Sequence, residues 1–343
     1  MRTNGLIGAE FYNILDLALG TLDDQPITTP STRLCQGENV ERITELNRRY
    51  GIPHQVSFSQ EPNGFVFVDV TNPQATARIA LQGAQIIHWS PKGEAPVIWL
   101  SEAASFLPGK SIRGGAPVCW PWFGPHETQR DFPAHGFART TLWEISGVES
   151  RPDGTTKLVF HLPESATPKN QWPHASTLES HITIGAHLEV DLVTRNQGNH
   201  PLTLGQALHT YFQVGDIRTV RLHGLDGCSY LDKVDGGVCK VQQGAVNFTQ
   251  ETDRIYLGTT HNVVIEDPQM QRQIHIAKRG SASTVVWNPW IEKAAKMGDL
   301  GENGYLHMVC VENANAAEDV VMLAPETDHH LWVRYSTTAL TST

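Results

Sequence analysis

Residues 142–162, LWEISGVESRPDGTTKLVFHL, contain two short runs rich in β-branched and aromatic side chains on either side of Pro152-Asp153-Gly154. Pro, Asp and Gly together are typical of a tight turn, because Pro fixes φ and Gly tolerates positive φ. Two extended runs that meet at such a turn predict an antiparallel hairpin formed by Leu142–Val148 and Lys157–Leu162. The rest of the fold is predicted outward from this hairpin.

The same rhythm of short apolar runs and turn residues continues on both sides of the hairpin. Ile182, Ile184, Leu188, Val190 and Leu192 alternate with polar neighbours, which predicts one long half-buried strand. Further runs lie at residues 65–70, 77–81, 86–89, 97–100, 202–212, 220–225, 263–265, 274–277, 308–311, 320–323 and 331–335. About 15 to 20 strands at this spacing, with little helical period, predict an all-β fold, a large antiparallel β-sandwich of two stacked sheets.

The N-terminal residues have a different character. Asn39 is a candidate N-cap for a helix over Val40–Tyr50, and Gly51 is suited to end it. Thr, Pro, Ser and Asp are frequent at residues 23–31, and residues 1 to about 38 are predicted to form a poorly anchored extension. We therefore expect an N-terminal extension with a short helix in residues 1–50 and a single β-sandwich domain in residues 51–343.

Composition excludes several classes of protein. The 343 residues carry a formal charge of -10, with 40% hydrophobic and 18% charged residues, which is typical of a folded globular protein. No apolar run approaches the roughly 20 residues of a membrane span, and nucleic-acid binding requires clustered Lys and Arg that an acidic chain lacks. The five cysteines are scattered and without CxxC spacing, so we expect reduced thiols and a cytoplasmic location.

The stretch Ser111–Thr140, SIRGGAPVCWPWFGPHETQRDFPAHGFART, contains too many Gly and Pro residues for a helix or a long central strand. Gly114-Gly115 permits a close approach of the backbone to a neighbour. One interpretation is an ordered loop that walls a pocket and offers Arg113 and Arg139 to an anion. The alternative is a packed structural loop with solvated arginines, and residue types alone do not separate the two.

Two residues in apolar strands have side chains suited to proton transfer. His209 lies within Leu204–Phe212, LGQALHTYF, and Glu312 ends the apolar run Met308–Val311. Taken singly, a core histidine and a solvated strand end are the more common interpretations. If both face one concavity, burial would raise the pKa of the carboxyl group, and the pair would suit general acid–base chemistry.

Other motifs add less. Trp287-Asn288-Pro289-Trp290 predicts a rigid aromatic turn that either faces a sugar ring or packs in the core. The known nucleotide-binding, serine-hydrolase and zinc-protease motifs are missing from the sequence. The adjacent His329-His330 is a poor metal chelate because neighbours in a strand point to opposite faces. We therefore expect no metal.

Six segments, taken together and in this order, resemble the hexose-6-phosphate mutarotases, also called glucose-6-phosphate 1-epimerases, of the galactose-mutarotase-like superfamily. The resemblance runs from about Val56 to Tyr335. It is carried by SIRGGAPVCWPWFGP, PAHGFART, LHTYF, QETD, TVVWNPWIEK and the strand ending in VEN. The resemblance implies a β-super-sandwich that interconverts the α and β anomers of a hexose 6-phosphate without a cofactor. We further expect a monomer whose partner is this small-molecule substrate.

The resemblance also implies the acid–base residues. His209, in LHTYF, matches the catalytic histidine of the family, and Glu312, in CVEN, matches its catalytic glutamate. Relatives often have Pro-Gly after this glutamate, whereas this chain has Asn313-Ala314, so the resemblance does not define the local turn. The implied mechanism has Glu312 as the base at O1 and His209 as the acid at O5.

The substrate-binding residues implied by the resemblance lie on three segments. Arg113 of RGG and Arg139 of HGFAR match arginines that line the site and suit the phosphate. Asp253 of QETD matches a sugar contact, and His135 matches a loop histidine that binds substrate in galactose mutarotases. Ala134 stands where relatives can have Gln, so that contact is lost or replaced.

Two other function classes are compatible with the same sandwich. A non-catalytic sugar-phosphate or carbohydrate-binding protein would need aromatic platforms and hydrogen bonds but no acid and base. A glycoside-cleaving enzyme would need two carboxylates flanking the scissile bond, for which Glu312 and Asp253 are the candidates.

Overall fold

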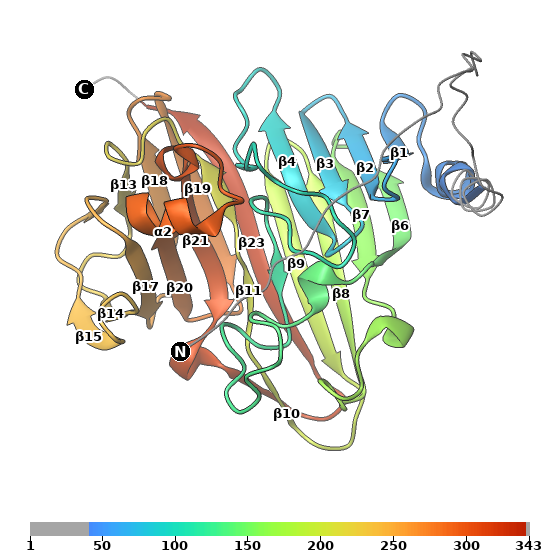
Figure 1. Cartoon of the computed structure of the whole chain (residues 1–343). Coiled ribbons are helices and arrows are strands. Elements are labelled where there is room, and N and C mark those ends of the chain that lie inside the picture. The colour runs from blue at the N-terminus through green and yellow to red at the C-terminus, as the bar shows by residue number, and fades with distance from the viewer. Residues whose placement is uncertain (1–40, 341–343) are drawn as a thin grey trace, which may run out of the picture. The chain divides into compact units, whose positions relative to one another are not determined.

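The structure is a computed structural model in which residues 41–340 are described (Figure 1). Within this range, 23 strands pair in antiparallel sheets, which confirms the expected all-β class with slightly more strands than predicted. The proposed N-cap Asn39 and the predicted N-terminal extension lie outside the described residues. A helix occupies residues 41–50 and ends at Gly51, as predicted.

The largest sheet has nine strands, and β23, drawn in red in Figure 1, lies between β19 and β9. Its strands in spatial order are β16 (Val246–Asn247), β13 (Arg221–His223), β18 (Val263–Asp267), β19 (Arg272–Arg279), β23 (Asp328–Ala339), β9 (Leu188–Asn196), β8 (Ser176–Ile184), β7 (Thr156–His161) and β6 (Glu144–Ser150). Strands β7, β8 and β9 alternate buried and half-buried residues, as expected of a sheet with one face in the core.

The second sheet has eight strands and carries the candidate site. Its strands are β15 (Val238–Val241), β14 (Ser229–Asp232), β17 (Thr252–Leu257), β20 (Ser283–Asn288), β21 (Met308–Asn315), β11 (Gln206–Leu208) and β5 (Val118–Cys119), with β12 (Tyr211–Gln213) also paired to β21. Every residue of β20 and β21 is buried, so both faces of this sheet are covered at its centre. One face meets the nine-stranded sheet, and the other faces the loops that form the site.

The remaining strands form two small sheets, and the helices are short. Strands β1 (Val56–Gln60), β2 (Val66–Thr71), β3 (Ala75–Ala80) and β4 (Gln85–Pro91) form a meander, and β10 (Leu202–Leu204) pairs with β22 (Val321–Leu323). Beside the first helix there are the α-helix α2 (Trp290–Met297) and the single-turn 3₁₀ helices η1 (Ala138–Thr140), η2 (Glu164–Ala166), η3 (Gly304–His307) and η4 (Ala317–Asp319).

The main buried cluster contains residues of both large sheets and of the four-stranded meander. Leu158 and Ile182 of the nine-stranded sheet belong to the same buried cluster as Val286 and Val311 of the eight-stranded sheet. A buried hydrogen bond also joins the two layers. The Tyr335 hydroxyl on β23 lies 2.8 Å from Thr210 Oγ1, in the residue that follows His209. The backbone that carries His209 is therefore fixed to the core behind it.

The predicted hairpin is confirmed, whereas the predicted long strand is wrong. Strands β6 and β7 pair antiparallel across the Pro-Asp-Gly turn. Residues 182–192 instead form the end of β8 and the start of β9, which pair with each other. The turn is closed by Gly185 N–H, which donates to the His187 carbonyl at 3.0 Å. The alternation continues in phase through this turn because Ile184 and Leu188 are an even number of residues apart, so the pattern alone did not reveal it.

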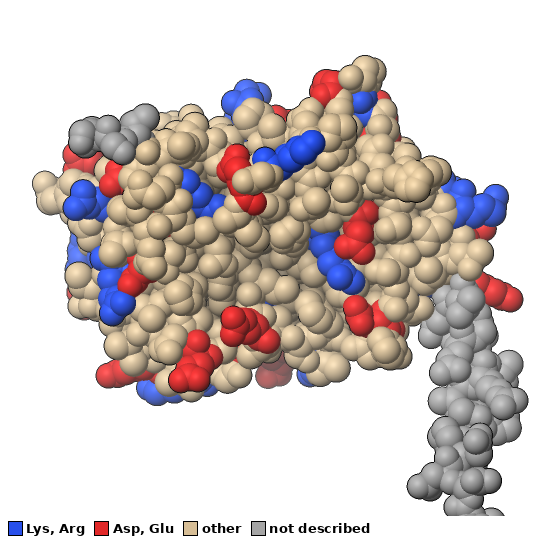
Figure 2. Space-filling view, turned by 90° about the horizontal axis from the view of Figure 1, so that it is seen from above, with Lys and Arg blue, Asp and Glu red and all other residues tan. Residues whose placement is uncertain are grey.

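Three further findings concern the first helix, membrane spans and the surface. Ile43, Leu46 and Tyr50 of the first helix pack against the core, which explains its amphipathic pattern. No helix within residues 41–340 is long and apolar enough to cross a bilayer. Figure 2 shows acidic and basic side chains interspersed over the face that it presents.

Candidate active site

A cavity of about 660 Å³ lies over the eight-stranded sheet, and all six residues singled out from the sequence line it. They are Arg113, His135, Arg139, His209, Asp253 and Glu312. The sequence positions of these residues span about two hundred places, and strand pairing is what brings them together. A cavity of this size is typical of a small-molecule site.

The register of the sheet fixes the floor of the cavity. Glu312 on β21 pairs with Val285 on β20, which pairs with Ile255 on β17. Asp253 pairs with Trp287 two residues along the same strands, so its side chain lies on the same face as those of Ile255 and Val285. It faces the cavity from the second strand along from the one that carries Glu312. The intervening floor is apolar and aromatic.

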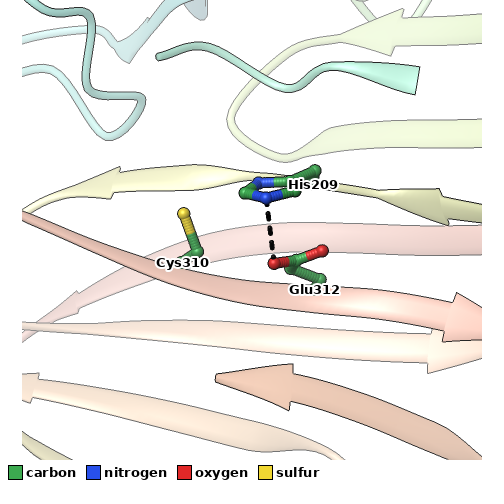
Figure 3. Close-up of side chains that lie close together, drawn as sticks. All are labelled: His209, Cys310 and Glu312. Atoms are coloured by element: carbon green, nitrogen blue, oxygen red, sulfur yellow. Dashed lines mark ion pairs between the residues drawn. The ribbon is translucent and has the colours of Figure 1, made fainter. Parts of the chain in front are cut away.

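His209 and Glu312 face each other directly. His209 follows β11 and Glu312 lies on β21, and Nε2 of the imidazole is 3.3 Å from Oε1 of the carboxyl group (Figure 3). The side chains are 12% and 1% exposed, so only the imidazole has appreciable contact with solvent. Glu312 was predicted as the end of a strand, but β21 continues to Asn315. This continuation explains why the carboxyl group is buried.

Burial shifts the ionisation of both groups toward their uncharged forms. Loss of solvation, with a contribution from Asp253, raises the pKa of Glu312 well above its usual 4.5. Loss of solvation, with the nearby His135 and Arg139, lowers the pKa of His209 well below 6.5. The two groups are close enough that their titrations are coupled. The resting pair therefore carries one proton and no net charge.

The orientation of the His209 ring depends on packing. Nδ1 of His209 is buried and has no hydrogen-bond partner among the described residues. The ring is stacked on Tyr211, with centroids 5.1 Å apart and planes inclined by 20°. Trp287 and His135 approach it edge-on, with centroids at 6.0 and 5.7 Å. The backbone N–H of His209 donates to the Pro117 carbonyl at 2.9 Å.

His135 lies in the loop that closes the cavity. Gly124 N–H donates to its Nδ1 at 3.3 Å, which leaves the proton of the neutral ring on Nε2. Loss of solvation, with the nearby positive charges of Arg139 and Arg113, lowers the pKa of His135 to about 3. The following residue, Gly136, has a φ of 71°, and a Cβ there would overlap the Trp120 carbonyl oxygen. His135 is thus a neutral hydrogen-bond donor held in place by a loop that requires glycine.

The two arginines differ in their partners. Arg113 Nε donates to Asp299 Oδ1 at 3.0 Å, and its Nη1 donates to the Tyr211 hydroxyl at 3.0 Å. Arg139 Nη2 donates to the Ala134 carbonyl at 2.9 Å, and within residues 41–340 no carboxylate pairs with it. The charge of Arg113 is therefore partly neutralised, whereas that of Arg139 is available to an anionic ligand.

A thiol also lies near the acid–base pair. The potential ligand atoms of His209, Cys310 and Glu312 all lie within 4.8 Å of one another (Figure 3). Metal binding by cysteine requires a thiolate. Burial, together with the Glu312 carboxyl group, raises the pKa of Cys310 well above 9.0. The chemistry of this cluster favours proton transfer over metal coordination.

The sequence matches known proteins over most of its length. Residues 67–336 match the Aldose 1-epimerase family. The chain belongs to the aldose 1-epimerase family. It is 42% identical over 250 residues to an Escherichia coli protein named "Putative glucose-6-phosphate 1-epimerase", covering 73% of this chain and 83% of that one. A Cenchrus ciliaris protein of the same name is 34% identical and covers 73% and 77% of the two chains.

Solved structures agree with this assignment. A Salmonella typhimurium structure described as a "putative mutarotase" superimposes with a TM-score of 0.78 at 33% identity, covering 88% of this chain and 99% of that one. This aldose 1-epimerase family member therefore has the mutarotase-like fold that its sequence motifs predicted.

Local departures from the family pattern have simple structural outcomes in this epimerase. Asn313, after the glutamate, is buried and donates to the Trp332 carbonyl at 3.0 Å, so the strand continues without a turn. Ala134 lines the cavity and offers its carbonyl to Arg139. Among the described residues that line the cavity, no amide side chain takes the place of the family Gln.

Sequence reasoning missed several cavity residues of this epimerase. Tyr211 lies two positions after His209 and therefore on the same side of the chain, a signal that was present in the sequence. Lys293 lines the cavity and lies 2.7 Å from Glu251 and 3.8 Å from Asp253. The predicted aromatic turn joins the end of β20 to the start of helix α2, and of its two tryptophans Trp287 lines the cavity.

Proposed function

We propose that this protein interconverts the α and β anomers of a hexose 6-phosphate, as a glucose-6-phosphate 1-epimerase. The observation that carries the proposal is the buried pair of His209 and Glu312, 3.3 Å apart at the floor of a cavity that also exposes Arg139. The names of its relatives support the phosphorylated substrate. Residues 51–343 are the catalytic domain in this proposal.

The reaction needs a proton taken from the C1 hydroxyl group and a proton given to the ring oxygen. Movement of one proton from Glu312 to His209 would convert the neutral pair to a carboxylate and an imidazolium. Glu312 then takes the proton from O1 while His209 gives its proton to O5, and the C1–O5 bond breaks to yield the open-chain aldehyde. Rotation about C1–C2 and reclosure with the roles exchanged produce the other anomer and return the pair to a carboxylate and an imidazolium, with its number of protons unchanged.

The phosphate group is assigned to Arg139, with Arg113 as a second contact. Arg139 is without a carboxylate partner in the described part of the chain, so charge-assisted hydrogen bonds to phosphate oxygens cost it no existing ion pair. A dianion at this position would also favour an imidazolium at His209, because it opposes the effect of the two arginines. Asp253 and His135 are assigned to sugar hydroxyl groups.

The test is anomer exchange followed by NMR on glucose 6-phosphate and on free glucose. Wild-type protein should accelerate exchange, more efficiently with the phosphorylated sugar. His209→Asn and Glu312→Gln should each lower kcat by about 10²–10⁴-fold, and the double variant should be little worse than either, because the pair acts as a unit. Wild-type rates in either single variant, with the fold intact, would refute the assignment. Binding of the sugar phosphate without any exchange would favour a non-catalytic binding protein.

The location and assembly of the protein belong to the same proposal. Cys119, Cys228, Cys239 and Cys310 are free thiols in the described region, which is consistent with a reducing compartment. We propose a cytoplasmic monomer that acts on a small molecule. Sedimentation velocity and fractionation of cells would test these two statements.

A further inference from the structure

Among the described residues, His209 lacks the hydrogen bond that usually orients a reactive histidine. In most such sites the second ring nitrogen makes a hydrogen bond that fixes the orientation of the imidazole. In this protein Nδ1 of His209 is buried without a partner among residues 41–340. The contact between Nε2 and Glu312 does not fix the ring by itself, because that nitrogen must exchange its proton during the reaction. Another contact must therefore hold the plane of the ring.

Tyr211 is placed to do this. Its ring is stacked on His209 at a centroid distance of 5.1 Å and an interplanar angle of 20°. On Tyr211 a second ring, that of Trp99, is stacked at 5.8 Å and 21°. Tyr211 is 3% exposed, so it has little freedom to move. Stacked rings restrict rotation about the side-chain bonds, which is what an imidazole without a second hydrogen bond requires.

The same tyrosine is bonded to the anion-binding side of the cavity. Its hydroxyl group accepts from Arg113 Nη1 at 3.0 Å, and Asp299 holds the Nε of that arginine at 3.0 Å. The main chain of Asp299 is fixed in turn, because its carbonyl accepts from the Ser101 hydroxyl at 2.8 Å. A continuous series of contacts therefore runs from Asp299 through Arg113 and Tyr211 to His209.

We propose that Tyr211 is the positioning residue for His209 and that its hydroxyl group links the orientation of this histidine to Arg113. The inference rests on the proposed acid–base role of His209. The ring of Tyr211 sets kcat for any sugar, because it sets the direction of Nε2. The hydroxyl group of Tyr211 sets KM for the phosphorylated sugar, because it holds Arg113.

Two variants separate the ring from the hydroxyl group. Tyr211→Phe keeps the stacking and should leave kcat on free glucose within about twofold of wild type. KM for glucose 6-phosphate should rise by about 3- to 10-fold, less than the about 10-fold or more that a full hydrogen bond to a charged group is worth, because Asp299 still holds Nε of Arg113. Tyr211→Leu removes the stacking and should lower kcat on both sugars by about 10²-fold, the cost of misplacing a reacting group by about 1 Å. A kcat that is near wild type in Tyr211→Phe but low in Tyr211→Leu would show that the aromatic ring positions His209.

A control and a second measurement keep the test decisive. Tyr256 is equally buried, its hydroxyl group donates to Gln242 at 2.8 Å, and it does not line the cavity. Tyr256→Leu should lose about as much stability as Tyr211→Leu but keep its kcat. An equal fall in kcat in both Leu variants would overturn the proposal. NMR of the His209 imidazole provides a readout that is independent of turnover, and its resonances should shift and broaden in Tyr211→Leu.

The failure of this proposal and that of the proposed function are distinguishable. Absence of anomer exchange in the wild-type protein would contradict the proposed function, while the His209 resonances would still report whether Tyr211 orients the ring. Normal exchange in the wild-type protein, with unchanged kcat and unchanged His209 resonances in Tyr211→Leu, would overturn the positioning role alone.

Discussion

Nε2 of His209 lies 3.3 Å from Oε1 of Glu312, and strand pairing brings these distant positions of the chain together. Leu208 pairs with Asn313 between β11 and β21. His209, which follows Leu208, and Glu312, which precedes Asn313, therefore meet on the cavity side. Both side chains are buried, and their ionisation is shifted toward the uncharged forms. The expected behaviour of the protein follows largely from this contact.

The pH dependence of turnover should reflect the coupled pair. A second proton inactivates the pair, and since the pKa of His209 is lowered well below 6.5, the acid limb of kcat/KM should fall below pH 6.5. Loss of the single proton gives the alkaline limb. Glucose 6-sulfate is a suitable substrate because its anion does not titrate in this range. An acid limb at or above pH 6.5 would contradict the shifted His209.

Stability should improve when Glu312 is made neutral. The folded-state pKa of Glu312 is raised above 4.5, so the stability contributed by its protonated form is complete below about pH 4.5 and is lost as pH rises through the folded pKa. Glu312→Gln cannot ionise, so its melting temperature should exceed that of wild type increasingly as pH rises. We expect a difference of about 1–2 kcal/mol near pH 8.

The matched control for this prediction is Glu318→Gln, a substitution at an exposed carboxylate six positions along the chain. Thermal unfolding of the three proteins between about pH 4.5 and 8 measures the effect. A difference in melting temperature between Glu312→Gln and wild type that stays constant across this pH range would show that ionisation of the buried carboxyl group does not cause the difference.

The arginines should contribute unequally to phosphate binding. Arg139→Ala should raise KM for glucose 6-phosphate by about 10-fold or more, because a charge-assisted hydrogen bond is worth about 1.5–3 kcal/mol. Arg113→Ala should have a smaller effect on this KM, because Asp299 already neutralises part of its charge. KM for free glucose serves as the reference in both variants. Equal increases in KM for the two sugars would contradict a role of these arginines in binding the phosphate group.

The loop that carries His135 should depend on a single glycine. A Cβ at Gly136 would overlap the Trp120 carbonyl oxygen, so Gly136→Ala must displace the loop. We expect a loss of about 3 kcal/mol in unfolding free energy and a marked fall in turnover. Gly124→Ala is the control, because Gly124 also has positive φ, at 76°, but a Cβ added there would meet no atom within 4 Å. Denaturant unfolding gives the free energy lost in each variant. The loss in Gly124→Ala measures the strain of positive φ alone, and the additional loss in Gly136→Ala measures the atomic overlap.

Local sequence patterns predicted much of the fold. The Pro-Asp-Gly turn and its flanking runs define the β6–β7 hairpin, and Gly51 ends the first helix, because turn and cap preferences act over a few residues. The same kind of pattern failed at residues 182–192. A tight turn at Gly185 left the alternation in phase, and one strand was predicted where two occur.

The sequence by itself determined that this chain forms antiparallel β-sheets, and its motifs marked six of the residues that line the cavity, because periodicity and residue type are local properties. Only the tertiary structure decided that Asp299 neutralises Arg113, that Arg139 keeps a free charge, and that Tyr211 is stacked on His209. These relationships depend on loops and strands that are remote in the sequence. Their distances, and the shifts in ionisation that burial produces, exist only once the sheets have paired.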